Sequence, residues 1–295
     1  SIISPLINSK KLLDISNEIL TINEFGEINN LSTNYKIYRS FPFMINFCEE
    51  IINQSSNKQK INFLFQTLTK SIRRINDLWE INVNNQSVIK SKNLIISSSL
   101  IAHPRCLEIL QIDSLPLRDA IAKGQDEVVD GVLKHLRKQK YISRKIYIFH
   151  VLNFAVLKSF NQQYSQIRFS KEIKENLNFE RVIFQRQSDG SMIITLHCFY
   201  LDDLIDISPD DIIKSLESIF VSHKIFLDLF SQARPIDKMF WRASQPLNHL
   251  LPKELQWSST SHIGFCGDWF NFNSCEGVET AMNSSIRLAK LINFK

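Results

Sequence analysis

The order of the elements that the sequence predicts favours a mixed fold, of the α/β or α+β class, with discontinuous domains. Short β-rich segments separated by Asn-Asp and Asn-Asn turns fill residues 61–97. Helical patterns lie on both sides of this region, and an antiparallel hairpin is predicted around residues 188–191. The chain then ends in a strand, a polar loop and a helix. A regular series of parallel strands and crossover helices would not give this order.

The composition is that of a soluble globular protein with enough apolar material for a substantial core. Of 295 residues, 44% are hydrophobic and 22% are charged, and 21 are Phe. This length allows one large domain or two ordinary ones. No apolar run approaches the length of a membrane span, and no signal peptide is visible. We therefore expect no membrane association.

The cysteines favour neither a metal site nor a disulfide framework. The chain has five, which are widely spaced: Cys48, Cys106, Cys198, Cys266 and Cys275. No pair has the C-x-x-C spacing of many zinc sites and redox motifs. An odd number of unpaired cysteines fits a reducing compartment, so we expect a cytoplasmic location.

The charge is mildly positive, +5 from 35 basic and 30 acidic residues. The densest basic run is residues 134–140, followed by Arg144 and Lys145. Such a run is usually a solvated helix face, and no nucleic-acid-reading motif surrounds it. We expect no nucleic-acid partner; binding of a nucleic acid or an anionic surface by residues 134–145 is the third of three hypotheses for function.

Two helices are predicted in the N-terminal part. Residues 10–22 carry apolar side chains at helical spacing, which are Leu12, Leu13, Ile15, Ile19 and Leu20. A second helix is expected after Pro42, because the apolar residues between Met44 and Ile52 form one broad face. The polar residues 54–60 read as a loop.

The β-rich region is predicted to contain four extended pieces. They are Ile61–Phe65, Thr67–Ile75, Trp79–Val83 and Val88–Ile96. The last piece leads through Asn93–Ser99, a buried-type strand that ends in small residues. His103 and Pro104 then begin a crossover to the next part of the chain.

Further helices are predicted over residues 116–140 and after Ser208. The first region has apolar residues at helical spacing. Ser208 is a helix cap, Pro209 occupies the first helical position, and acidic residues fill the first turn. We expect this second helix to run to about Leu229.

Extended segments lie between and after these helices. Residues 145–157 are apolar and extended, and residues 234–245 are extended as well. Strands over residues 179–187 and 192–200 flank the turn Ser188-Asp-Gly-Ser191, a strong hairpin signal.

The stretch from Ser261 to Met282 has the form best suited to a ligand. A short apolar strand ends at Gly267 and Asp268, and a helix with small residues in its first turn follows a polar loop. Free N–H groups and the positive end of the helix dipole favour polar or anionic ligand groups. The Asp268 carboxylate can accept hydrogen bonds from hydroxyls. The alternative is an ordinary strand, loop and helix that close a domain.

These residues resemble a known family. Gly264-Phe-Cys-Gly-Asp268, followed by Glu276-Gly277-Val278 and Ala281, resembles the last flavin-binding motif of FAD-dependent amine-oxidase-like oxidoreductases, and among them the renalase-like group. Three more segments resemble the family in the same order. They are Tyr38–Met44 leading into a helix, the strand and meander of residues 61–97, and Phe240–Pro246, which resembles a Trp-Arg-x-x-Gln-Pro-like strand.

Two features depart from the family. Its members begin with a strand, a G-x-G-x-x-G turn and a helix that hold the FAD pyrophosphate, whereas the nearest glycine here is Gly26, alone. The chain therefore resembles a member that lacks this N-terminal unit, with residues 1–5 at the point just after it. Phe43 stands where relatives usually carry Gly, and its side chain would crowd the flavin.

The resemblance implies two discontinuous domains. One is a Rossmann-like FAD/NAD(P)-binding domain without its N-terminal βαβ unit, over residues 58–100 and 246–295. The other is an inserted substrate domain of antiparallel sheet and helices, over residues 1–57 and 101–245.

The resemblance also implies the cofactor-binding residues, which are Gly267, Asp268, Glu276, Gly277, Val278 and Ala281. Asp268 would accept hydrogen bonds from the ribityl or phosphate-proximal part of FAD, and Gly267 would allow close backbone approach. The N–H groups of Gly277 and Val278 would face the pyrimidine carbonyl and stabilise the reduced flavin. A loop or capping role is the alternative for Asp268 and Glu276.

Four residues are candidates for the substrate pocket: Phe43, Trp241, Arg242 and Gln245. Trp241 and Gln245 share one face of an extended segment, although a core Trp beside a surface Arg is an equal explanation. No catalytic residue is assigned. The histidines at strand ends or in apolar strands, His103, His150, His197 and His262, read as structural, and hydride transfer to a flavin needs no protein nucleophile.

The first hypothesis is a renalase-like FAD-dependent oxidoreductase. Hydride would pass from a reduced small-molecule substrate to FAD, and oxygen would reoxidise the flavin to give hydrogen peroxide. The implied substrates include an isomeric reduced NAD(P), which is a dinucleotide, while amines and other hydride donors stay open. The second hypothesis is a truncated or degenerate, non-catalytic relative that does not retain FAD, because several backbone hydrogen bonds to the pyrophosphate would be lost.

Overall fold

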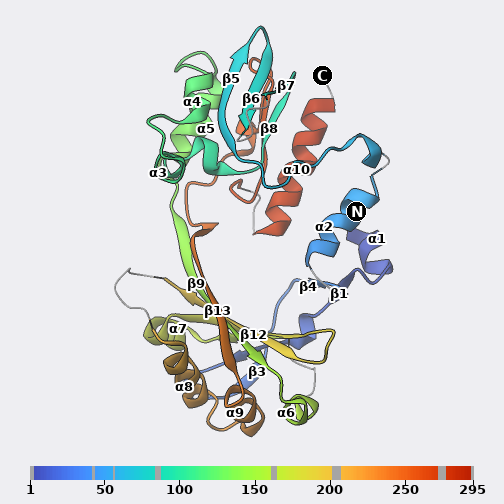
Figure 1. The fold of residues 1–295 in the computed structure, drawn as a ribbon, viewed down its shortest axis with the longest axis vertical. Helices are drawn as coiled ribbons and strands as arrows, with labels where there is room; N and C mark the ends of the chain where they lie inside the picture. Colours follow the sequence, from blue (N-terminus) through green and yellow to red (C-terminus); the bar gives the residue numbers. More distant parts are fainter. Residues whose placement is uncertain are drawn as a thin grey trace. The chain divides into compact units, whose positions relative to one another are not determined.

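The chain folds into two compact units. The computed structural model describes residues 3–41, 44–55, 57–83, 88–160, 165–200, 207–271 and 277–293. Unit 1 comprises residues 1–62 and 143–242, and unit 2 comprises residues 63–142 and 243–295 (Figure 1). Each unit combines sheets with helices, so the predicted mixed class is confirmed.

Unit 1 is built on a seven-stranded sheet with the strand order β13-β9-β12-β11-β10-β2-β3. Its strands are β2 (Ile19–Ile22), β3 (Ile28–Asn30), β9 (Tyr141–Val151), β10 (Gln166–Phe169), β11 (Phe179–Arg186), β12 (Met192–Phe199) and β13 (Arg234–Pro246). β10 pairs in parallel with β2, and β11 pairs with β10 and β12 in antiparallel. The predicted hairpin is confirmed as β11 and β12, whose turn contains Gly190 at φ +85°.

Helices on one side of this sheet complete the core of unit 1 (Figure 1). They are α6 (Phe154–Ser159), α7 (Lys171–Leu177), α8 (Pro209–Ile219) and α9 (Lys224–Phe230). Phenylalanines dominate the contact between sheet and helices, as in the pair Phe184 of β11 and Phe226 of α9, whose ring centres are 5.8 Å apart. The Ser208 hydroxyl caps α8 as predicted, but one predicted helix is two, because the chain turns at residues 220–223.

The helix predicted over residues 10–22 is wrong. This segment forms β1 (Leu12–Asp14), a short 3₁₀ turn (Ser16–Glu18) and β2. β1 pairs with β4 (Tyr38–Ser40), and the Asp14 carboxylate accepts hydrogen bonds from the Ser16 N–H and hydroxyl at 3.0 and 2.6 Å. Sheet pairing and this local turn therefore outweigh the helical spacing of the apolar residues.

Two more helices lie in the N-terminal part of unit 1, α1 (Ile3–Asn8) and α2 (Met44–Asn53). The second confirms the helix expected after Pro42. The extended segment predicted over residues 145–157 is confirmed as far as Val151, where β9 ends. The side chain of Asn153 then accepts hydrogen bonds from two N–H groups of α6, which starts a helix in place of a continued strand.

Unit 2 contains two three-stranded sheets. One is the antiparallel meander β5 (Thr69–Ile75), β6 (Leu78–Val83) and β7 (Val88–Ser91). The other has the order β14-β15-β8, with β14 (Trp257–Ser258), β15 (Ile263–Phe265) and β8 (Leu94–Ile96). β15 and β8 are parallel, so strands distant in sequence lie side by side. The strand predicted over residues 61–65 is absent from these described sheets.

Helices cover both sides of the strands in unit 2 (Figure 1). On one side lie α3 (Arg105–Leu110), α4 (Pro116–Ala120) and α5 (Glu127–Leu136), and on the other α10 (Val278–Asn293). Short 3₁₀ turns occupy Lys58–Lys60 in unit 1 and Ser99–Ala102 and Lys253–Gln256 in unit 2. The core joins Val129 and Val132 of α5 to Phe265 of β15 and Trp269.

The boundaries of the units differ from the predicted ones. Residues 101–142 lie in unit 2, whereas the prediction grouped them with the inserted domain. Their apolar side chains, such as Leu117 and Val132, belong to the same buried core as Ile263. Helices α4 and α5, which lie in the region predicted to be helical, therefore share a core with the C-terminal strand β15. The assignment of a cofactor to one unit and of a substrate to the other stays a prediction.

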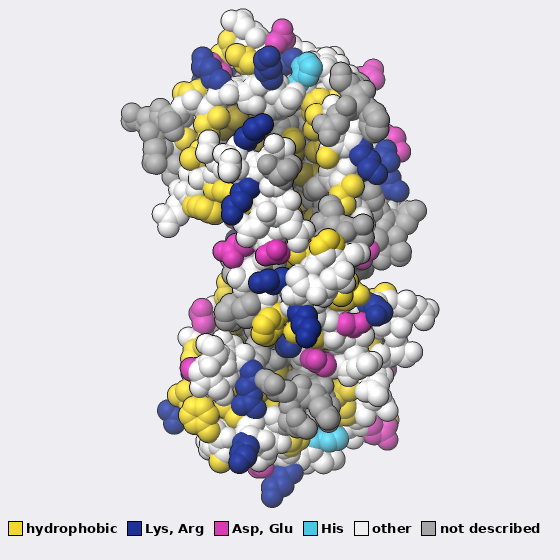
Figure 2. Space-filling view, turned by 90° about the vertical axis from the view of Figure 1, so that its right-hand side faces the viewer, with side chains coloured by type: hydrophobic (Ala, Val, Ile, Leu, Met, Phe, Trp, Pro, Cys, Tyr) yellow, Lys and Arg dark blue, Asp and Glu magenta, His cyan; other side chains and the backbone are white. Residues whose placement is uncertain are grey.

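On the face shown in Figure 2, Lys and Arg side chains are interspersed with Asp, Glu and uncharged side chains. The described part of that face therefore presents scattered charges rather than one continuous basic stripe. None of the described helices combines the length and the apolar character that crossing a membrane requires.

Candidate functional site

Two parallel strands of unit 2 end at the same edge of their sheet. Phe265 of β15 lies opposite Ile96 of β8, and the Cys266 N–H donates to the Ile96 carbonyl at 3.0 Å. Ser97 and Gly267 therefore leave the sheet side by side. In open sheets with parallel strands, ligands bind beyond these carboxyl ends.

Only glycine fits at position 267. Its φ is +143°, and a Cβ atom there would lie 2.0 Å from Trp269 Nε1 and 3.0 Å from the Ser97 carbonyl oxygen. Trp269 cannot yield easily, because it is 2% exposed and its Nε1–H donates to the Cys266 carbonyl at 2.8 Å. The turn that presents Asp268 is thus held by close packing of the backbone.

Helix α10 fixes this turn through Ser284. The Gly267 N–H donates to Ser284 Oγ at 2.8 Å, and the Ser284 hydroxyl lies 3.1 Å from the Gly267 carbonyl and 2.8 Å from the Ala281 carbonyl. Ser284 is fully buried. Ala281, predicted to bind the cofactor, therefore lies in the helix next to this anchor.

A pocket of about 350 Å³ opens beside Asp268. Its wall comes from Ser97–Ser99, which follow β8, from His103 and Arg105, from Tyr141 and from the segment around Ser244. All of these residues belong to unit 2. Most of the lining is polar, which suits a ligand that carries hydroxyl or charged groups.

The Tyr141 phenol is held in a hydrogen-bond chain. Its hydroxyl lies 2.6 Å from Ser99 Oγ and donates to Gln139 Oε1 at 2.9 Å, so Ser99 is the donor in the first bond. Burial raises the pKa of Tyr141, and the bond from Ser99 opposes this only in part. The phenol is therefore a protonated, positioned group in the pocket wall.

The contacts of His103 fit the structural role that the sequence predicted for this histidine. Its Nδ1 accepts the Arg105 N–H at 3.1 Å, so its Nε2 carries the proton and donates to the Gln139 carbonyl at 3.3 Å. Burial lowers the pKa of His103 below its usual value. The imidazole is therefore neutral, and both of its nitrogens form hydrogen bonds within the protein.

Asp268 is half-buried at the pocket edge. Burial raises the pKa of its carboxyl above the usual value of 3.8. Among the described residues the Asp268 carboxylate forms no ion pair. A carboxyl exposed to a polar pocket and held without a cation is suited to accept hydrogen bonds from hydroxyls of a ligand.

The other predicted site residues are placed as follows. Gly277 has φ +57°, and a Cβ atom there would lie 3.8 Å from Gln245 Nε2, so the start of α10 and Gln245 are neighbours. Val278 begins α10 and is 55% exposed. Trp241 and Arg242 lie on β13 within unit 1, with Arg242 Cζ 5.7 Å from the Phe240 ring centre.

Two of the predicted residues, Phe43 and Glu276, lie outside the described part of the chain. The structure thus brings Gly267 and Asp268 together with a pocket, and Gln245 with Gly277. It adds Arg105, Tyr141 and Ser284, which the sequence did not single out. Only the run Ser97–Ser99 carried a signal, as small residues at the end of a strand.

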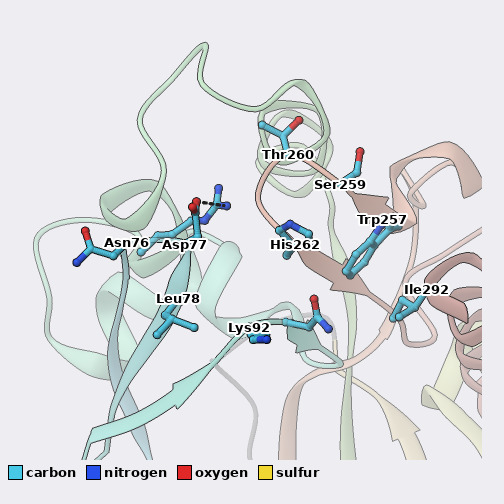
Figure 3. A pocket seen from close by; sticks show the side chains of 11 residues that line it. Asn76, Asp77, Leu78, Lys92, Trp257, Ser259, Thr260, His262 and Ile292 are labelled. Carbon is cyan, nitrogen blue, oxygen red and sulfur yellow. Dashed lines mark hydrogen bonds and ion pairs between the residues drawn. The ribbon is translucent and has the colours of Figure 1, made fainter. Parts of the chain in front are cut away.

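A larger pocket of about 780 Å³ lies at the opposite ends of the same strands. Figure 3 shows Lys92, Trp257 and His262 around it, with the Arg74–Asp77 ion pair at 3.3 Å. Asn93 precedes β8 and His262 precedes β15, so this pocket is at the amino ends. It includes none of the predicted site residues, and we take the pocket at Asp268 as the candidate site.

Comparison with known proteins supports the fold. No protein-family model matches the chain, and no curated protein matches its sequence. Among solved structures, a redesign of cofactor binding in putrescine oxidase has a TM-score of 0.56 at 11% identity, over 88% of this chain and 54% of the other. An oxidoreductase from Methanosarcina mazei has a TM-score of 0.50 at 11% identity, over 88% and 55%.

A third solved structure, a fatty acid isomerase from P. acnes that produces CLA, has a TM-score of 0.50 at 10% identity, over 85% of this chain and 52% of the other. The chain spans about half the length of these three solved structures. At these identities the likeness concerns the fold. It agrees with the mixed α/β fold predicted from the sequence.

Proposed function

We propose that the protein is an FAD-dependent oxidoreductase of the amine-oxidase-like class and of the renalase-like type. The observation that carries the proposal is the turn at Gly267 and Asp268, which only glycine allows. It presents a side-chain carboxyl that forms no ion pair with any described residue, at the edge where two parallel strands end. Two solved structures with a similar fold are oxidoreductases by name. Neither observation alone decides the chemistry, but both favour the same class.

The residues present fit the cofactor. Gly267 leaves the backbone open to close approach, and Asp268 is placed to accept hydrogen bonds from ribityl hydroxyls. Gly277 and Val278 would direct their N–H groups and the positive end of α10 towards an anionic part of the ligand. When bound, FAD would supply the hydride chemistry, accepting hydride from a reduced substrate and returning electrons to oxygen as hydrogen peroxide.

We propose further that the sheet β14-β15-β8 is one part of a larger Rossmann-like sheet. β8 is an edge strand, and Ile95 is 51% exposed. Ile95 of β8 lies opposite Gly264 of β15, and Gly264 packs against Leu288 of α10. Helix α10 therefore covers β15 on this face of the sheet, while β8 is exposed on the same face at Ile95. Parallel strands are usually covered on both faces, which supports a further strand and helix beside β8.

For the substrate, we propose a small hydride donor and place a reduced dinucleotide such as an isomer of reduced NAD(P) first. Unit 1, with its long antiparallel strands, would take the part of the substrate domain and unit 2 that of the FAD-binding domain. Trp241 and Arg242 would then serve the substrate from β13.

The visible absorption spectrum of the purified protein tests the proposal. We expect bound flavin that survives desalting or that returns when FAD is added. Asp268→Asn should weaken FAD binding about tenfold, as one hydrogen bond to a charged acceptor is lost, while Asp113→Asn on the exposed surface of unit 2 should not. A colourless protein that also rejects added FAD would contradict the proposal and favour the non-catalytic relative.

A further inference from the structure

The pocket beside Asp268 contains a second charged group, Arg105, which the proposed function does not use. Arg105 begins α3 and lines the same pocket. Its Cζ atom lies 5.8 Å from the centre of the Tyr141 ring, a cation–π contact that holds the guanidinium along the pocket wall. The backbone N–H of Arg105 donates to His103 Nδ1, and this bond fixes the backbone from which the Arg105 side chain extends.

Arg105 and Asp268 do not neutralise each other. Within the described part of the chain neither forms an ion pair with any residue. A guanidinium next to Asp268 would also hold the pKa of that carboxyl low, whereas its pKa is raised by burial. The pocket therefore offers a cation and a carboxyl at separate places.

Arg105 is partly buried and forms no ion pair among the described residues, so desolvating its charge is costly, and a ligand anion would offset that cost. The hydroxyl of Ser97 lines the same pocket and can donate to an oxygen of such an anion, whereas the Ser99 hydroxyl already donates to Tyr141. His103 cannot contribute, because it is neutral and both of its nitrogens are occupied. The donors are thus the planar guanidinium of Arg105 and the Ser97 hydroxyl, which together suit a group with several oxygens.

We propose that Arg105 binds the phosphate of a polyol or sugar phosphate whose neighbouring hydroxyls bond to Asp268. The pocket, about 350 Å³, is large enough for such a fragment. This inference rests on the proposed function for the identity of the whole ligand, because the ribityl phosphate part of FAD has this chemistry. The recognition itself depends only on Arg105 and Asp268 on the two sides of one pocket.

The test compares ligands with and without the phosphate on the full chain. Riboflavin, which lacks a phosphate, and FMN are titrated by flavin fluorescence, and ribose 5-phosphate is titrated by calorimetry. The variants are Arg105→Gln, Arg105→Lys and, as a charge-matched control in the same unit, the exposed Arg137→Gln. Thermal melting checks that each variant is folded.

We expect the wild-type protein to bind FMN at least tenfold more tightly than riboflavin, the ratio expected for one charge-assisted contact. Arg105→Gln should remove this preference and leave riboflavin binding unchanged, Arg105→Lys should keep part of it, and Arg137→Gln should keep all of it. If Arg105→Gln does not fold, the salt dependence of wild-type binding decides: FMN affinity should fall with added salt, and riboflavin affinity should not.

Equal weakening of riboflavin and FMN by Arg105→Gln would overturn the inference and leave the proposed function intact. Equal salt dependence for the two flavins would do the same. If no flavin binds but ribose 5-phosphate binds in a manner that depends on Arg105, the inference holds and the proposed function fails. If neither flavin nor ribose 5-phosphate binds, both are overturned.

Discussion

Replacing Gly267 by Ala tests the close packing on which the candidate site depends. A Cβ atom at this position would lie 2.0 Å from Nε1 and 2.3 Å from Cδ1 of Trp269. Because Trp269 is 2% exposed, its ring cannot rotate into solvent. Either the ring or the turn at Ser97 must shift.

The expected cost is the sum of three effects. The positive φ of +143° strains an L-residue, on the order of 1–2 kcal/mol. Displacing Trp269 breaks its hydrogen bond to the Cys266 carbonyl, about 1 kcal/mol, and overpacks the core by roughly 1–3 kcal/mol. We expect the free energy of unfolding of unit 2 to fall by about 3–6 kcal/mol.

Gly124→Ala is the matched control, because Gly124 has φ +85° in the same unit and a Cβ atom there would meet nothing within 4 Å. It should cost only the backbone strain, about 1–2 kcal/mol. Urea unfolding followed by tryptophan fluorescence measures both variants, since Trp79, Trp257 and Trp269 lie in unit 2. Equal losses of stability in the two variants would refute the argument that Trp269 confines this turn.

Three further variants probe the interactions around the site and in unit 1. Ser284→Ala leaves the buried Gly267 N–H without an acceptor and should lower the free energy of unfolding in urea by about 1–3 kcal/mol. Ser285 is the exposed neighbour, and Ser285→Ala should change stability by less than about 0.5 kcal/mol. Similar values for the two variants would contradict the anchoring role of Ser284. Arg144 and Glu180 form a buried ion pair with two hydrogen bonds, at 2.6 and 2.9 Å. Arg144→Ala leaves the Glu180 carboxylate buried without its partner and should lower the free energy of unfolding by about 3–5 kcal/mol. Lys171→Ala, in the exposed pair with Glu175, should lower it by less than about 0.5 kcal/mol. Burial raises the pKa of Asp268 above 3.8, so the folded state binds the proton of this carboxyl more tightly than the unfolded state does, and stability is lost as the pH rises through the folded pKa. Asp268→Asn should therefore be more stable than the wild type at pH 7, and the difference should shrink towards pH 4. A difference that is independent of pH would show that ionisation of Asp268 is not the cause.

The elements that the sequence predicted correctly are those that local chemistry specifies. The Ser208 hydroxyl accepts the Asp211 N–H at 3.1 Å, as the Ser-Pro-Asp-Asp signature requires. Asn76 and Asp77 both have positive φ, 50° and 61°, which makes the tight turn between β5 and β6. In both cases a few consecutive residues determine the backbone, so no distant partner is needed.

The errors arise where distant partners decide. The apolar residues of 10–22 match a helix in isolation, yet β2 gains a parallel partner in β10, with Ile19 opposite Gln166. Likewise, the pocket combines Ser99 with Tyr141, 42 positions apart. A sequence pattern shows neither pairing, because both depend on how the units fold rather than on spacing along the chain.

The candidate site itself departs from what stability alone would favour. Arg105 and Asp268 line one pocket, and an ion pair between them would lower the cost of burying each charge. Gly267 adds the entropy cost of a glycine in the unfolded chain. Groups kept apart and unpaired in this way cost stability in the empty protein and gain it back when a ligand supplies an anion to one and hydroxyls to the other. Ligand binding should therefore stabilise unit 2 more in the wild type than in Arg105→Gln, because only the wild type has the charge that the ligand anion would neutralise.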